Sequence, residues 1–215
     1  MDGTPHGWVD GTEGGIANVP NLITTIRTVV AVCLGVPAIV TGSAALTGAA
    51  IACYWIGDML DGLVARRMRQ ETRFGAVYDI VCDRVCSVVA AAALVPLLPS
   101  MALPLGIFVV QFVLVDLLLS LAFLRWPVLS PNYFYLIHKQ VFRFNWSPLA
   151  KAVNTGGLVI LVVIAPSPIY PVVFALAVTT VKIASLVAVA RIPPARIPPA
   201  GAPGAEVSGV RAATS

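Results

Sequence analysis

Four aspartates lie close together in a chain that is otherwise strongly apolar. Residues 58–83 read DMLDGLVARRMRQETRFGAVYDIVCD, and their carboxylates belong to Asp58, Asp61, Asp79 and Asp83. Residues three and four apart share one face of a helix, so the first two aspartates form one stripe and the last two form another. Carboxylates that are held together in a dry site repel one another unless positive charge compensates them. Such a cluster therefore needs cations.

The type of ligand indicates which cations these would be. Carboxylate oxygens suit hard divalent ions such as Mg²⁺ and Mn²⁺, and four aspartates can hold two of them. Metals about 3.5–4 Å apart are a recurrent device for displacement at phosphorus, because they stabilise both the entering and the leaving oxygen. Gly62 and Gly75 fit this chemistry, since a missing side chain lets a bulky ligand approach the backbone.

The spacing of these residues forms a signature. It reads D-x-x-D-G-x-x-A-R, then eight residues, then G-x-x-x-D-x-x-x-D, and it resembles the signature of the CDP-alcohol phosphatidyltransferase family at every specified position. The resemblance implies that two divalent metal ions are bound by Asp58, Asp61, Asp79 and Asp83. It implies that Asp83 is also the base that activates the acceptor hydroxyl. It further implies that the CDP part of the donor is contacted by Asp58, Asp61, Gly62, Arg66 and Gly75. Charges that pair at helix ends would explain one such aspartate, but hardly the whole pattern.

The composition is that of an integral membrane protein. Hydrophobic residues make up 58% of the 215 residues, charged residues make up 11%, and the mean hydropathy is +0.89, which does not suit a soluble domain. The net charge of +4 comes from basic residues scattered over helix ends and tails. Anionic lipid is therefore a better partner than nucleic acid, which needs a dense basic patch. The four cysteines lie in apolar segments and are interpreted as small core residues: Cys33, Cys53, Cys82 and Cys86.

The apolar runs predict an all-α bundle of six transmembrane helices. The helices are expected at about residues 21–41, 44–69, 73–98, 104–124, 148–165 and 170–191. Six helices are also the usual plan of the family, so the resemblance would extend over a domain at residues 18–191. Residues 1–17 are interpreted as a flexible tail and residues 192–215, rich in Pro and Ala, as a disordered tail.

The distribution of basic residues predicts the topology. Arginines crowd the connection between the second and third predicted helices, which the positive-inside rule assigns to the cytoplasm. Six helices then put both termini in the cytoplasm, and the three outer connections contain no Lys or Arg. We therefore expect a multi-pass protein of the cell membrane with its active site facing the cytoplasm.

Three further features concern charged and aromatic residues elsewhere in the chain. Asp116 lies in an apolar run, where a charge is costly, and Lys182 is the candidate partner for an ion pair. Arg84, beside Asp83, could either neutralise excess carboxylate or contact phosphate. Residues 125–147 mix basic residues with seven aromatic ones, which predicts amphipathic structure at the membrane interface.

Two weaker sequence patterns indicate which alcohol could be the acceptor. The opening P-N-L-I-T-x-x-R, from Pro20 to Arg27, looks like the first-helix start of the phosphatidylglycerophosphate synthase and cardiolipin synthase branch of the family. Arg27 could face the site or reach lipid phosphates instead. The stretch LAKAVNT around Lys151 departs from the K-x-K-T pattern of phosphatidylglycerophosphate synthases and is closer to the K-V-N-T of eukaryotic-type cardiolipin synthases. An anionic acceptor needs cationic partners, and the candidates are Arg27, Lys139, Arg143 and Lys151.

The resemblance thus implies a membrane enzyme that transfers a phosphatidyl group from CDP-diacylglycerol to an alcohol acceptor and releases CMP. Glycerol 3-phosphate is the first candidate acceptor, and phosphatidylglycerol, inositol phosphate or another polyol are the alternatives. The resemblance also implies a homodimer. A divalent-ion transporter is the alternative from another class, but a conduit needs polar lining throughout, and the acidic residues other than Asp116 cluster toward one face. An inactive relative that acts as a scaffold is a third possibility, against which the presence of all four aspartates argues.

Overall fold

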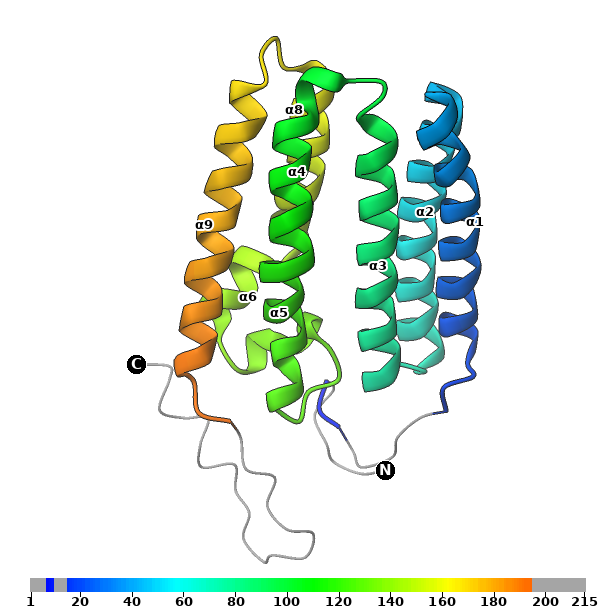
Figure 1. Cartoon of the computed structure of the whole chain (residues 1–215). Coiled ribbons are helices and arrows are strands. Elements are labelled where there is room, and N and C mark those ends of the chain that lie inside the picture. The colour runs from blue at the N-terminus through cyan, green and yellow to red at the C-terminus, as the bar shows by residue number, and fades with distance from the viewer. Residues whose placement is uncertain (1–6, 10–14, 195–215) are drawn as a thin grey trace, which may run out of the picture.

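The computed structural model describes residues 7–9 and 15–194 and shows a bundle of long helices (Figure 1). These residues contain helices and one isolated antiparallel bridge, between Trp8 and Val128, which confirms the all-α prediction. Most of the two predicted tails lies outside the described residues. The described part of the first tail lies against the loop after the fourth predicted helix, where Val9 N donates to Pro127 O and Leu129 N donates to Gly7 O, each at 3.0 Å.

Three helices form the first half of the bundle: α1 (Val19–Thr41), α2 (Ala44–Met68) and α3 (Arg73–Leu94). Each begins at a polar residue whose side chain accepts a hydrogen bond from the backbone N–H three residues later, namely Asn18, Ser43 and Thr72. Gly42 joins α1 to α2 with a φ of +62°, a left-handed conformation that glycine adopts without strain. Short connections make these helices antiparallel neighbours, and α1 packs along both others.

The second half contains two helices that each include a π-helical turn. The first runs from α4 (Ala102–Val110) through η2 (Gln111–Asp116) into α5 (Leu117–Leu121). The second runs from α7 (Pro148–Lys151) through η5 (Ala152–Gly157) into α8 (Leu158–Ile164). The long helix α9 (Ile169–Arg191) completes this half. Such turns are wider than an α-helical turn and frequently occur at functional sites.

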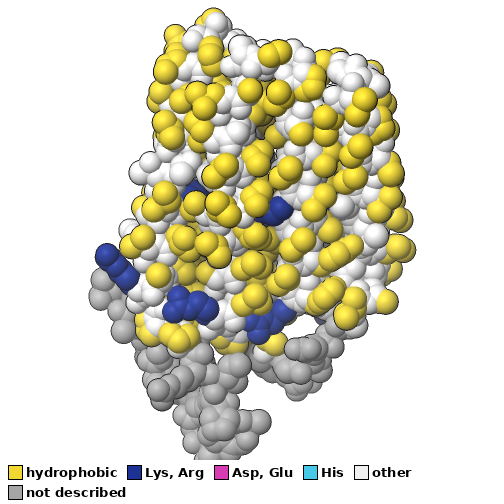
Figure 2. All heavy atoms as spheres, viewed as in Figure 1, with side chains coloured by type: hydrophobic (Ala, Val, Ile, Leu, Met, Phe, Trp, Pro, Cys, Tyr) yellow, Lys and Arg dark blue, Asp and Glu magenta, His cyan; other side chains and the backbone are white. Residues whose placement is uncertain are grey.

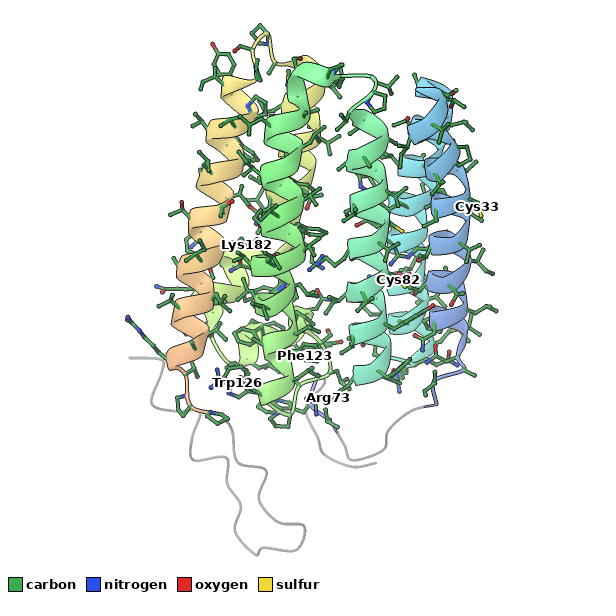
Figure 3. The ribbon with its side chains drawn as sticks, viewed as in Figure 1. Cys33, Arg73, Cys82, Phe123, Trp126 and Lys182 are labelled. Atoms are coloured by element: carbon green, nitrogen blue, oxygen red, sulfur yellow. The ribbon has the colours of Figure 1, made fainter. Side chains whose placement is uncertain are left out.

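The polar segment between α5 and α7 folds into a small aromatic core. It contains η4 (Pro131–Leu136) and α6 (Lys139–Asn145). The buried ring of Phe134 lies 5.4 Å from that of Trp126 and 4.9 Å from that of Trp146, and Figure 3 shows Phe123 and Trp126 at this end of the bundle. Several aromatic side chains of the segment predicted to lie at the membrane interface therefore pack on one another, and its position relative to the membrane stays a prediction.

Five of the helical segments that the structure describes are long and apolar enough to cross a membrane: Val19–Thr41, Ala44–Met68, Pro99–Arg125, Lys139–Ile164 and Ile169–Arg191. Hydrophobic side chains cover most of the visible face of the bundle (Figure 2). The helix α3 has 22 residues, but its first twelve include Arg73, Asp79, Asp83 and Arg84, so its composition is less apolar. Six spans and the orientation of the termini remain predictions.

The cysteines are not all in the core. Cys82 and Cys86 are buried and Cys53 is half-buried, but Cys33 is exposed on the outer face of α1 (Figure 3). The prediction is therefore wrong for Cys33. The outer face of an apolar helix of this length would meet lipid, where a small apolar side chain needs no protein neighbours.

Candidate active site

The four aspartates converge between the second half of α2 and the first half of α3. Asp58, Asp61 and Asp79 each offer a carboxylate oxygen, and these atoms lie within 4.8 Å of one another. The side chain of Asp61 is 5% exposed and that of Asp83 is 21% exposed, whereas Asp58 and Asp79 are 45% and 38% exposed. The two predicted stripes thus face each other, with Asp61 at the closed side of the cluster and the other carboxylates more open.

Arg27 of α1 lies in the middle of the cluster. Its Nε donates to Asp61 Oδ2 at 2.8 Å, and its Nη2 donates to Asp83 Oδ1 at 3.0 Å and to Asp79 Oδ1. The same Nη2 lies 3.7 Å from Asp58 Oδ1. With a side chain only 2% exposed, Arg27 faces the site rather than lipid phosphates.

Gly57, which the sequence did not single out, and Thr24 of the first-helix pattern allow this position of Arg27. A Cβ atom at Gly57 would lie 2.5 Å from Arg27 Cβ, so the arginine can pack against α2 only because Gly57 has no side chain. Thr24, one turn before Arg27, donates from Oγ1 to Asp61 Oδ2 at 2.7 Å. The only sequence signal for Gly57 is its position directly before the first aspartate, whereas Thr24 is the threonine of the P-N-L-I-T-x-x-R pattern.

The donor set fits divalent cations. Four carboxylates face one guanidinium, so the cluster carries excess negative charge, which is costly in a partly buried site unless further cations neutralise it. Every ligand atom is a carboxylate oxygen, which is the chemistry that Mg²⁺ and Mn²⁺ prefer. Asp58, Asp61, Asp79 and Asp83 could therefore hold such ions.

A cavity of about 830 Å³ opens beside the cluster, between the two halves of the bundle. This volume lies within the usual range of ligand sites, about 300–1,000 Å³. The four aspartates line it together with the other signature residues, Gly62, Arg66 and Gly75. The structure thus brings all the signature residues to one wall of one cavity.

The signature glycines also permit close packing within the protein. A Cβ atom at Gly75 would lie 2.9 Å from Asn21 Oδ1 of α1, and one at Gly62 would lie 3.3 Å from Arg66 Nη1. Both glycines therefore leave room for neighbouring polar side chains as well as for a ligand.

The opposite wall carries a second charged group, built around Asp116. Lys182 Nζ pairs with Asp116 Oδ1, which confirms the predicted ion pair, and Figure 3 shows Lys182 between α9 and the α4–α5 helix. Arg84 Nη2 donates to Asp116 Oδ2 at 2.6 Å. Arg84 thus pairs with Asp116, an arrangement that the two alternatives for this arginine did not include.

The structure brings only two of the four predicted acceptor residues to the site. Lys151 lines the cavity, where its Nζ donates to Asn132 Oδ1 at 2.8 Å, and Arg27 lies within the aspartate cluster. Lys139 and Arg143 are exposed on α6 and are not among the residues that line the cavity. Of the four candidate cations, two are therefore brought to the site.

A tyrosine and a glutamate meet at the cavity without having been predicted. Tyr133 Oη donates to Glu71 Oε2 at 2.7 Å, and Glu71 lines the cavity. Burial and the hydrogen bond to Glu71 raise the pKa of the Tyr133 hydroxyl above its ordinary value. This hydrogen bond joins the α2–α3 connection to η4.

Comparisons with known proteins agree with the signature. A family model described as CDP-alcohol phosphatidyltransferase matches residues 17–190. The chain is 38% identical over 76 residues to a protein named phosphatidylinositol phosphate synthase from Mycobacteroides abscessus. This match covers 35% of the chain and 34% of that protein, so it spans about a third of the length of the curated relative. No solved structure matches the chain.

Proposed function

Because this chain belongs to the CDP-alcohol phosphatidyltransferase family, we propose that it transfers a phosphatidyl group from CDP-diacylglycerol to an alcohol acceptor and releases CMP. One observation carries the proposal. Carboxylate oxygens of Asp58, Asp61 and Asp79 lie within 4.8 Å of one another on the wall of a cavity of about 830 Å³. A pyrophosphate substrate requires concentrated positive charge. This carboxylate cluster is suited to bind the divalent cations that would supply that charge.

Two divalent cations, Mg²⁺ or Mn²⁺, would be held by Asp58, Asp61, Asp79 and Asp83. When bound, they would supply charge stabilisation for the reacting phosphate and for the leaving oxygen. Gly62, Arg66 and Gly75 would contact the CDP part of the donor together with Asp58 and Asp61. The position of Arg66 beside Gly62 and in the cavity lining supports this assignment.

Asp83 would act as the general base. It would accept the proton of the acceptor hydroxyl, whose oxygen attacks the lipid-side phosphorus while the bond to the CMP oxygen breaks. The partial exposure of its side chain, 21%, and its place in the cavity lining support this role. Arg27, which donates to Asp83 Oδ1 at 3.0 Å, would orient the carboxylate. No covalent enzyme intermediate is required.

A lipid donor suits an active site that lies in a membrane protein. Five apolar helices together with this family make the chain a multi-pass membrane protein. We place the reaction at the cytoplasmic surface of the cell membrane, because the basic connections flank the aspartate end of the bundle. The acyl chains of the donor would stay in lipid while its nucleotide and the acceptor arrive from water. Six spans, cytoplasmic termini and a homodimer belong to the same proposal.

The acceptor has two principal candidates. Glycerol 3-phosphate is favoured by the first-helix pattern and by the cationic side chain of Lys151, which lines the cavity. Inositol phosphate is favoured by the similarity to a protein named phosphatidylinositol phosphate synthase. Phosphatidylglycerol, favoured by the stretch around Lys151, is a third option.

A CMP-release assay tests the proposal. The purified full-length protein in detergent would receive CDP-diacylglycerol, Mg²⁺ or Mn²⁺, and one acceptor from a panel of glycerol 3-phosphate, phosphatidylglycerol, inositol 1-phosphate, serine or none. We expect one acceptor to stimulate CMP release and EDTA to abolish it. If no combination of metal and acceptor releases CMP, the proposal fails, and flux of divalent cations into vesicles becomes the next measurement.

A further inference from the structure

The described residues before α1 include a short segment, Gly7–Val9, that is docked on the chain just before η4. Two backbone hydrogen bonds of 3.0 Å join it to Pro127 and Leu129, on either side of the bridge to Val128. The side chain of Trp8 packs against the aromatic core. We call Gly7–Val9 the N-terminal strap, because it is far from η4 in the sequence and yet lies against it in the fold.

The first residue of the N-terminal strap fits against the ring of Tyr133. Gly7 is buried and has a φ of +102°, a conformation that residues with a side chain rarely adopt. A Cβ atom at Gly7 would overlap with Tyr133 Cδ1. The backbone of the strap can therefore lie against this ring only because glycine stands at this position.

The N-terminal strap supports one rim of the cavity. Four successive residues, Leu129–Asn132, line the cavity directly after the strap contacts, and we call them the rim. The strap satisfies the N–H of Leu129 and the C=O of Pro127. Val128, which lies between these two groups, is fully buried, and unpaired backbone groups beside a buried residue are costly. Loss of the strap would therefore leave the start of the rim poorly held.

Tyr133 connects the rim to the other half of the bundle. It follows the rim directly in the sequence, and its hydroxyl donates to Glu71 Oε2 at 2.7 Å. Glu71 belongs to the α2–α3 connection and lines the cavity, as do its neighbours Gln70 and Thr72. Tyr133 thus contacts the N-terminal strap with its ring and holds the α2–α3 connection with its hydroxyl.

The conformation of the α2–α3 connection depends on such contacts. Arg69, where α2 ends, has a φ of +52°, which is uncommon for a residue with a side chain and persists where neighbouring contacts impose it. Glu71 is only two residues away. Arg66, three residues before Arg69, lines the cavity and is proposed above to contact the CDP part of the donor. The contact that holds Glu71 therefore also bears on the last turn of α2 and on Arg66.

We infer that the N-terminal strap is a positioning element of the active site, which acts through Tyr133 and Glu71 to keep Arg66 in place for the donor. The inference rests on the proposed function, because it concerns the binding of CDP-diacylglycerol. Gly7, Trp8 and Val9 are not among the described residues that line the cavity. The strap thus acts on the donor through the rim and the α2–α3 connection, without touching it.

The variant Gly7→Ala tests the strap at its contact with Tyr133. We expect faster amide hydrogen exchange in residues 127–133 of the full-length protein in detergent, measured by mass spectrometry, because the new side chain prevents docking. We expect KM for CDP-diacylglycerol to rise about fivefold and kcat to change less than about twofold, since the loss is of the size of one hydrogen bond and affects binding. Gly15→Ala is the matched control, because a Cβ atom at this exposed glycine meets no atom within 4 Å.

The variant Tyr133→Phe tests the next link. It keeps the ring beside Gly7 and removes the hydroxyl that binds Glu71, so we expect KM for CDP-diacylglycerol to rise by a similar factor. The control is Tyr135→Phe, because Tyr135 is exposed and is not among the described residues that line the cavity. In the double variant Gly7→Ala/Tyr133→Phe the two effects should not multiply, since both act through the same hydrogen bond. Effects that multiply would contradict a path from the strap through Tyr133.

The outcomes separate this inference from the proposed function. If the unmodified protein releases no CMP with any acceptor of the panel, the proposed function fails and the inference fails with it. If it releases CMP but Gly7→Ala leaves either hydrogen exchange in residues 127–133 or KM for CDP-diacylglycerol unchanged, only the inference is overturned. Should Gly7→Ala not fold, Trp8→Ala takes its place, because it removes the packing of the strap on the aromatic core.

Discussion

The two walls of the cavity use buried charge in opposite ways. On one wall, four carboxylates share the single guanidinium of Arg27, and three of them are 21–45% exposed. On the other wall, one carboxylate, that of Asp116, is shared by Arg84 and Lys182, and all three residues are buried. The first arrangement keeps an excess of negative charge, whereas the second is already paired. One cavity thus combines an acidic cluster suited to divalent cations with a charged group that is neutralised within the protein.

Substitution of the proposed base on the first wall should lower activity without abolishing metal binding. We expect Asp83→Asn to lower the rate of CMP release about a thousandfold, because the variant cannot accept the proton of the acceptor hydroxyl. Mg²⁺ should still raise the melting temperature of the variant, since the other three aspartates remain. Turnover at the wild-type rate would exclude Asp83 as the base, and loss of the Mg²⁺ effect would assign it mainly to metal binding.

An Asp→Asn substitution on the other wall, at Asp116, should lower the stability of the protein. We expect Asp116→Asn to lower the free energy of unfolding by about 3 kcal/mol, because Arg84 and Lys182 would then be buried without a counter-charge. Thermal unfolding of the EDTA-treated protein in detergent measures this loss.

Asp58→Asn provides the matched control for that substitution. The Asp58 side chain is 45% exposed and lies 3.7 Å from Arg27, so removing its charge relieves repulsion among the four carboxylates. We expect no loss of stability in the metal-free protein. Equal losses in the two variants would show that the walls do not differ in the way described.

A smaller effect is expected where α1 and α2 approach each other. Gly57→Ala should destabilise the protein by about 2 kcal/mol, since the new Cβ would lie 2.5 Å from Arg27 Cβ and neither atom can move without its helix. In Gly48→Ala the new Cβ would meet no atom within 4 Å, so this control should be neutral or slightly stabilised. If both variants unfold at the same temperature, contact between the helices does not determine the position of Arg27.

Helix periodicity was sufficient to predict the aspartate wall. Asp58 and Asp61 lie on one stripe and Asp79 and Asp83 on another, and a short connection brings the two stripes together. The Asp116–Lys182 pair could also be predicted, because a lone charge in an apolar span needs a partner. Helix boundaries were predicted from the apolar runs, whereas the capping residues Asn18 and Thr72 are visible only in the structure.

The remaining features depend on contacts that leave little trace in the sequence. Arg84 follows Asp83 directly, but neighbours on a helix point about 100° apart, so Arg84 reaches Asp116 on a different helix. Gln111 is a single amide in an apolar run, and nothing in its surroundings announces a π-helical turn. Gly57 follows the large residues Trp55 and Ile56, and its importance is visible only from its contact with Arg27.

The bridge between Trp8 and Val128 links the order of synthesis to the order of assembly. The segment at Gly7–Val9 leaves the ribosome before any helix of the bundle, yet its hydrogen-bond partners at Pro127–Leu129 follow only after α5 has been made. These hydrogen bonds therefore cannot form until residues 127–129 have been synthesised. The segment at Gly7–Val9 thus has no access to these partners while the ribosome makes α1, α2 and α3.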